Sequence, residues 1–158
     1  ISPLAKNVTD FRAGETAKIF NVGDAKISPV ICFEILDDNL MRGSFGKSNL
    51  IVAQTNNATF GKSSESDQQL KITRARAIES GLSIIAVSTV GNTALIDPTG
   101  KIVDILPKYA AGILYGEVNL STANTYAHWL STWVDKGSFA VITILLLSIL
   151  KRKYLRIS

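Results

Sequence analysis

Short runs of branched and aromatic residues recur along the first 120 residues, and turn-forming residues separate them. The runs at 49–55 and 82–90 are continuously apolar, which is typical of strands that are buried on both faces. The other strands are predicted at 17–22, at 27–33 with its regular part after Pro29, in a hairpin over 92–106 that turns at residues 97–100, and at 112–120.

Two helices are predicted between these strands. From Glu34 onward, apolar residues recur at helical spacing. A second helix is expected over 66–80, with Ser66 or Asp67 as its N-cap and Gly81 as its C-terminal stop. Strands that alternate with helices and end in a hairpin predict an α/β fold with a mixed sheet.

The C-terminal segment has a different pattern. Residues 137–150 carry no charge, and a helix of these 14 residues covers only about 21 Å of the ~30 Å hydrocarbon core of a bilayer. A buried core helix is therefore one interpretation. The flanks favour a second one, because Trp129 and Trp133 resemble an interfacial aromatic belt and a basic tail follows. A helix over 130–150 is long enough to cross a membrane, so 126–150 is predicted to be an interfacial segment with a transmembrane helix.

Charge adds an orientation to this prediction. The chain of 158 residues has a net charge of +4, from 17 basic and 13 acidic side chains. Lys151, Arg152, Lys153 and Arg156 account for the excess, so 151–158 is predicted to be a cytoplasmic tail and the rest to lie outside. Basic patches interleaved with aromatics are absent from the sequence, which argues against a nucleic-acid partner, and no His/Cys spacing predicts a metal site.

The only cysteine, Cys32, stands where a strand is expected to end and a helix to begin. Free cysteine is among the most buried residue types, so a filler of the core is one interpretation. The strand-to-helix position favours a nucleophile instead. The backbone N–H of Phe33 could stabilise a thiolate or an oxyanion there, and Glu34 brings a carboxylate close to the thiol. The residues alone leave both interpretations open.

Three segments together carry a family resemblance. They read PVICFE, then NLIVAQTNNATFG, then QQLKITRARAIESGLSIIAVSTVGNTALIDPTGKIV. In this order they resemble the second half of a carbon–nitrogen hydrolase (nitrilase-superfamily) domain and, more narrowly, the bacterial apolipoprotein N-acyltransferase family. The resemblance extends over about 11–150. It implies an α-β-β-α sandwich, with residues 1–125 as the C-terminal part of the domain, followed by one transmembrane helix.

The resemblance also assigns roles to individual residues. Cys32 matches the nucleophile of a Glu-Lys-Cys triad, and Glu34 matches a second acidic residue of the family's cysteine motif. The backbone N–H of Phe33 matches an oxyanion donor, although many members have Tyr at this position. The residues that match a substrate-pocket loop are Asn56, Phe60 and Gly61, whereas Asn57 and Thr59 stand where the family often has Asp and Trp.

The triad Glu and Lys of the family belong to segments upstream of the cysteine strand. The chain is therefore expected to be a C-terminal fragment that has no activity alone. The complete enzyme would move a phospholipid acyl chain, through a thioester on Cys32, to the N-terminal diacylglyceryl-cysteine amine of an apolipoprotein. It would need no cofactor, and its partners would be the phospholipid donor, the diacylglyceryl-modified apolipoprotein and the bacterial cytoplasmic membrane. Two alternatives remain: an amidase of the same superfamily that acts on a small amide, and a non-catalytic membrane-tethered remnant.

Overall fold

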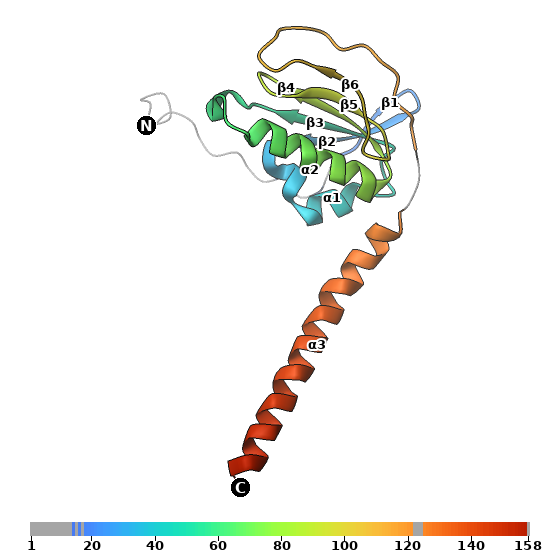
Figure 1. The fold of residues 1–158 in the computed structure, drawn as a ribbon. Coiled ribbons are helices and arrows are strands. Elements are labelled where there is room, and N and C mark those ends of the chain that lie inside the picture. The colour runs from blue at the N-terminus through green and yellow to red at the C-terminus, as the bar shows by residue number, and fades with distance from the viewer. Residues whose placement is uncertain (1–13, 15, 17, 122–124, 158) are drawn as a thin grey trace.

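Six strands form one mixed sheet in the computed structural model, which describes residues 14, 16, 18–121 and 125–157 (Figure 1). The strands lie in chain order; the three central ones run parallel, and the outer ones are antiparallel to their neighbours. They are β1 (Phe20–Val22), β2 (Ala25–Ile31), β3 (Leu50–Thr55), β4 (Ser83–Ser88), β5 (Thr93–Ile96) and β6 (Ile102–Leu106). The predicted α/β class and the mixed sheet are therefore confirmed.

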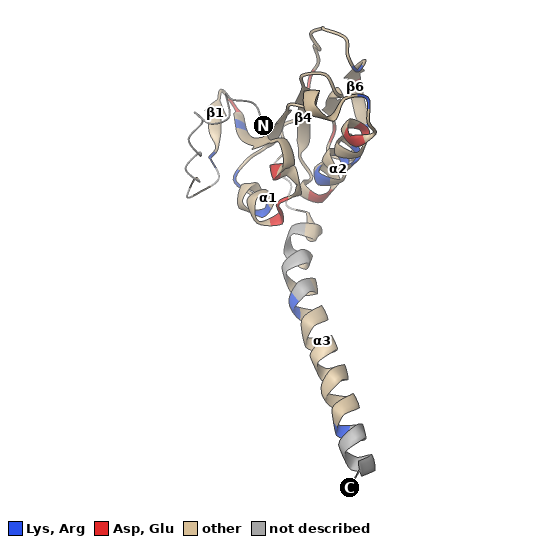
Figure 2. Cartoon of the chain, turned by 90° about the vertical axis from the view of Figure 1, so that its left-hand side faces the viewer, with Lys and Arg blue, Asp and Glu red and all other residues tan. Residues whose placement is uncertain are grey.

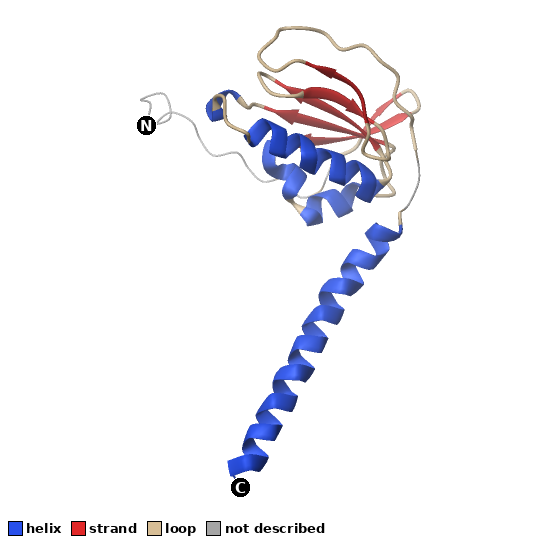
Figure 3. Cartoon of the chain, in the orientation of Figure 1, coloured by secondary structure: helices blue, strands red, loops and turns tan. Residues whose placement is uncertain are grey.

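Helices cover one face of this sheet (Figure 3). They are α1 (Asp38–Ser44) and α2 (Glu65–Ser80), accompanied by the short 3₁₀ helices η2 (Cys32–Leu36) and η3 (Ala58–Phe60). The core lies between the two layers, because alternate strand residues point to the same face and pack against the helices. Its buried apolar members are Val30, Ile35, Met41, Phe45, Ile51, Ala53, Ala77, Leu82, Ile84, Ala86, Ala94 and Ile96.

The other face of the sheet is more open. Ile31 at the end of β2 and Val87 in β4 point to it, and they are 62% and 44% exposed. Their strand neighbours Val30 and Ala86 point to the helices and are buried. Toward their carboxyl ends the two faces of the central strands therefore differ in burial, whereas Leu50 and Ser83, at the starts of β3 and β4 on the same face as Ile31, are buried.

The helix ends follow their local sequence. The helix predicted over 66–80 is confirmed as α2, and Gly81 ends it in the left-handed conformation at φ 67° while its N–H donates to the carbonyl of Ala77. The predicted N-cap is wrong, because α2 begins at Glu65, one residue before the buried Ser66, and its N-cap is Ser64.

The helix expected from Glu34 is interrupted. Asp37 separates η2 from α1, and its carboxylate accepts hydrogen bonds from the N–H groups of Asn39 and Leu40 at 2.8 and 3.1 Å. An aspartate that caps a new helix in this way breaks the preceding turn, although the apolar spacing continues through it. The predicted hairpin turn at 97–100 is confirmed, with the Gly100 N–H donating to the Asp97 carbonyl at 2.9 Å.

The strand expected at 112–120 is wrong. The described residues 107–121 form a loop that pairs with no strand, and Ile113 and Tyr115 are 73% and 80% exposed. A strand forms only where a neighbouring strand satisfies its backbone groups, so the branched residues of this segment are not enough to make one. The loop is held at its end instead, where the Ser83 hydroxyl donates to the carbonyl of Asn119 at 2.8 Å.

A long helix, α3 (Tyr126–Ile157), extends away from the sheet (Figure 1). Its middle carries no charged side chain (Figure 2). In the part of the chain that the structure describes, no helix is long and apolar enough to cross a membrane. The transmembrane helix predicted over 130–150 is therefore not found; its charge-free part covers only about 21 Å as a helix. The side chains of Trp129, Arg152, Lys153 and Arg156, on which that prediction also rested, lie outside the described residues.

Candidate active site

Cys32 is the first residue of η2 and follows directly on β2, in a strained turn. Its φ is +53°, a left-handed conformation that residues other than glycine seldom adopt. The residue is half-buried and is not a member of the apolar core. Strained backbone of this kind is concentrated at functional sites, and in other hydrolytic folds a strand-to-helix turn exposes the nucleophile. The geometry therefore marks Cys32 as the leading candidate for chemistry.

Glu34 closes this turn. Its carboxylate accepts a hydrogen bond from the backbone N–H of Ile31 at 2.7 Å, so the side chain reaches back across Cys32. The structure thus gives Glu34 a contact with the backbone on the N-terminal side of the thiol. We refer to residues 31–36, which include this contact and all of η2, as the cysteine elbow.

The predicted pocket loop lies beside the elbow in part. The ring of Phe60 packs edge-on against that of Phe33, with 5.9 Å between the ring centroids and an interplanar angle of 77°. Asn56, which follows β3, accepts a hydrogen bond from the Thr89 hydroxyl at 2.8 Å. Gly61 has a positive φ of 54°, and its carbonyl accepts from the Tyr109 hydroxyl.

These groups meet because of the strand order. Parallel strands place their carboxyl ends at the same edge of a sheet, which is where open α/β sheets bind ligands. Cys32 follows β2, Asn56 follows β3 and Thr89 follows β4. The pairing of Ile31 with Gln54, and of Gln54 with Val87, brings these three ends side by side.

A polar network behind the elbow was not foreseen from the sequence. Gln69 of α2 donates to the carbonyl of Cys32 at 3.3 Å and to the hydroxyl of Thr55 at 3.1 Å. The side-chain oxygen of Gln69 accepts a hydrogen bond from the side-chain amide nitrogen of Asn57 at 2.9 Å, and the side-chain oxygen of Asn57 accepts one from the Ser88 hydroxyl. All five residues line one small cavity. The only signal in the sequence was that Gln69 is a polar residue on the helix face that packs toward the sheet. This position alone does not identify its hydrogen-bond partners.

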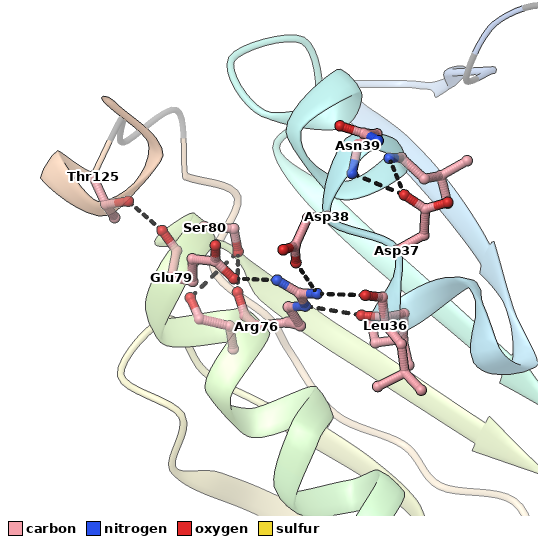
Figure 4. Close-up of polar contacts among 11 residues, drawn as sticks. Leu36, Asp37, Asp38, Asn39, Arg76, Glu79, Ser80 and Thr125 are labelled. Atoms are coloured by element: carbon pink, nitrogen blue, oxygen red, sulfur yellow. Dashed lines mark hydrogen bonds and ion pairs between the residues drawn. The ribbon is translucent and has the colours of Figure 1, made fainter. Parts of the chain in front are cut away.

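Arg76 holds the other end of the elbow (Figure 4). Its guanidinium donates to the carbonyls of Ile35 and Leu36 at 2.8 and 3.1 Å and forms ion pairs with Asp38 and Glu79, each at 2.6 Å. Hydrogen bonding to Arg76 holds the pKa of the Asp38 carboxyl below its usual value. Gln69 and Arg76 are seven residues apart on α2, so one helix face holds both ends of the elbow.

In the described ranges, no group of three or more His, Cys, Asp or Glu side chains is arranged to hold a metal ion.

Solved structures share this fold. An amidase of the nitrilase superfamily from Nesterenkonia AN1 superposes with a TM-score of 0.55 at 16% identity, over 71% of this chain and 44% of that one. A CN-hydrolase superfamily protein from Xanthomonas campestris superposes with a TM-score of 0.52 at 21% identity, over 61% of this chain and 41% of that one. At these identities the likeness concerns the fold alone, and it confirms the nitrilase-like part of the fold prediction.

Curated relatives share more of the sequence. The apolipoprotein N-acyltransferase of Pseudomonas putida is 33% identical over 126 residues, which are 78% of this chain and 25% of that protein. The apolipoprotein N-acyltransferase of Rickettsia prowazekii is 30% identical over 150 residues, which are 93% of this chain and 29% of that protein. The chain therefore spans about a quarter of the length of these relatives.

A family model also matches most of the chain. The carbon-nitrogen hydrolase model matches residues 3–128, which include the whole sheet, the cysteine elbow and α2. Most of the chain is covered, so the match concerns the domain and not an isolated motif. The chain belongs to the carbon-nitrogen hydrolase family.

Proposed function

We propose that this chain is the cysteine-bearing part of an apolipoprotein N-acyltransferase. The observation that carries the proposal is the presentation of Cys32 at φ +53° on a strand-to-helix turn, at the carboxyl ends of three parallel strands. The relatives of that name support the choice of reaction within the family. The core-filler interpretation of Cys32 has less support, because the residue is half-buried and lies outside the apolar core.

The proposed reaction has two transfers. The Cys32 thiolate attacks the ester carbonyl of a phospholipid, the ester C–O bond breaks, and a lysophospholipid leaves with the proton that the thiol had lost to a base. The N-terminal amine of a diacylglyceryl-modified apolipoprotein then attacks the resulting thioester. The C–S bond breaks, an amide forms, and the proton lost by the amine restores the thiol. The second transfer regenerates the enzyme, so the reaction needs no cofactor.

The proposed roles of the surrounding residues follow from their positions. The backbone N–H of Phe33, the first after the thiol, would donate to the oxyanion of each tetrahedral intermediate. Glu34 would support catalysis by fixing the turn through the Ile31 N–H. Asn56, Phe60 and Gly61 would border the acyl chain, and the contact of Phe60 with Phe33 favours an apolar wall there.

We further propose that this chain alone does not turn over. A thiol needs a base, and the oxyanion gains from a cation. The family's triad supplies both from a Glu and a Lys upstream of the cysteine strand, and the chain corresponds to only about a quarter of the length of the relatives. Removing members of a catalytic unit costs several orders of magnitude in rate.

We also propose that the protein acts at the outer surface of the bacterial cytoplasmic membrane. Both substrates in the proposed reaction are lipids held in a bilayer. Apolar side chains are exposed along α3, among them Phe139, Ile144 and Leu147, and these would favour contact with lipid.

A chimera tests the reaction class. In it, this chain replaces the matching quarter of the Pseudomonas putida enzyme, and the purified protein is offered phospholipid vesicles with a diacylglyceryl-modified lipopeptide, or a small aliphatic amide. We expect N-acylated lipopeptide from the chimera and none from its Cys32→Ser variant, with similar thermal unfolding of the two. Release of ammonia from the amide without lipopeptide acylation would identify an amidase instead. A folded chimera that is inactive in both assays would identify a non-catalytic remnant.

A further inference from the structure

The side chain of Gln69 has a partner for each of its polar groups. The amide nitrogen donates to the Cys32 carbonyl and to the Thr55 hydroxyl, and the amide oxygen accepts from Asn57. A carbonyl oxygen can only accept, so the amide nitrogen of Gln69 must face Cys32. The bond to Cys32 joins positions that are 37 residues apart, which makes it a tertiary contact of the elbow and not a local turn.

The partners of Gln69 are themselves fixed. Asn57 is 3% exposed, and it accepts from the Ser88 hydroxyl, which also accepts from the backbone N–H of Gly91. A Cβ at Gly91 would lie 2.4 to 2.7 Å from the side-chain oxygens of Ser66, Asn57 and Ser88, so only glycine fits there. This packing leaves the Gln69 amide one orientation, with its donor toward the elbow.

The bond falls on the strained residue itself. A left-handed conformation at a residue with a Cβ persists only where the surrounding structure enforces it. Glu34 acts on the backbone before Cys32 and Arg76 on the carbonyls after it, whereas Gln69 binds the carbonyl of Cys32 directly. We propose that Gln69 is a positioning residue, which holds Cys32 in its left-handed conformation and thereby aims the thiol. Its importance for catalysis rests on the proposed function; its effect on the elbow does not.

The reactivity of the thiol provides a test that needs no lipid substrate. Cys32 is the only cysteine of the chain, so every modification by iodoacetamide reports on this residue. The variant Gln69→Leu keeps a side chain of similar size and removes both donated bonds. The matched control is Thr73→Val on the same helix. Thr73 is 3% exposed and lines the same cavity, but its hydroxyl donates only to the backbone carbonyl of Gln69, within the helix.

We expect the alkylation rate of Gln69→Leu to fall about tenfold across the pH profile, because the thiol no longer points out of the turn. NMR couplings that report φ are expected to show Cys32 with a negative φ in this variant and a positive φ in the wild type and in Thr73→Val. Thermal unfolding of each variant shows whether it is as stable as the wild type, so that a change in alkylation rate is not caused by loss of the fold. If Gln69→Leu does not fold, Gln69→Glu replaces it, since glutamate keeps the length and the acceptor but loses the donor.

The outcomes separate the two proposals. A positive φ at Cys32 together with an unchanged alkylation rate in Gln69→Leu would overturn the positioning role. Equal changes in Thr73→Val would also overturn it, because loosening of α2 would then explain the effect. Loss of acyl transfer in the chimera, with the expected alkylation behaviour retained, would overturn the proposed function and leave the positioning role standing.

Discussion

The two faces of the central strands differ in what they carry. On the face toward α1 and α2, Val30 and Ile84 are fully buried, whereas Ile31 on the other face is 62% exposed. The contacts of α2 with the cysteine elbow, from Gln69 and Arg76, also come from the covered side. The layer that stabilises the fold is therefore also the layer that shapes the turn at Cys32. Substitutions on the covered face should lower the free energy of unfolding more than substitutions on the open face.

The largest difference in the free energy of unfolding is expected between substitutions of two isoleucines, one on each face. Ile84→Ala should lower the free energy of unfolding by about 2–5 kcal/mol, because it leaves a cavity in the core. Ile31→Ala should cost about 1 kcal/mol or less, because most of this side chain already contacts solvent. Chemical denaturation of both variants measures the difference. Equal losses would mean that the open face is covered in solution and that the comparison fails.

Two arginines of α2 provide a sharper test within the covered layer. Arg76→Ala should cost about 2–3 kcal/mol, because it leaves the carbonyls of Ile35 and Leu36 without their charged donor. Arg74→Ala is the matched control; Arg74 is exposed and donates to the carbonyl of Gly100, so its loss should cost about 1 kcal/mol or less. Denaturation again measures both, and a larger cost for Arg74 would refute the assignment of Arg76 to the elbow.

A smaller effect is expected from acid. The pKa of Asp38 is lowered in the folded protein, chiefly by its hydrogen bond with Arg76. The stabilisation is therefore complete above the ordinary aspartate pKa and disappears as the pH falls through the folded value. Asp38→Asn should be less stable than the wild type at neutral pH, and the two should converge in acid. The difference should be small, since the side chain is 59% exposed to solvent.

A double variant isolates this contribution. In the Arg76→Ala background, Asp38→Asn should have a much smaller effect on the pH dependence, because the chief partner that lowers the pKa of Asp38 is gone and only the charge of Arg42 remains. A convergence in acid that persists undiminished without Arg76 would show that another group stabilises the Asp38 carboxylate.

Local patterns predicted much of this fold. The apolar runs at 49–55 and 82–90 became β3 and β4, and Gly81 ended α2 as expected, because each of these features depends on neighbouring residues alone. The strand expected at 112–120 failed for the opposite reason: strand propensity is realised only when the segment pairs with a neighbouring strand, and neighbouring residues in the sequence do not decide that.

The candidate site likewise contains features that the sequence predicted and features that depend on tertiary packing. Cys32 and the strand-to-helix junction were visible in the sequence, and the structure places them as expected. The bond from Gln69 to the Cys32 carbonyl was not visible, because it depends on how α2 packs over the ends of β2 and β3. The catalytic roles of Cys32 and Glu34 stay predictions.

The covalent state of Cys32 tests the proposed thioester mechanism most directly. The chimera described above is incubated with phospholipid vesicles and no acceptor amine, and the intact protein and its peptides are analysed by mass spectrometry. We expect one acyl chain on Cys32, which hydroxylamine releases as it does a thioester, and none on the Cys32→Ala variant. An unmodified Cys32 in a folded chimera, together with acyl transfer that survives Cys32→Ala, would contradict the thioester mechanism.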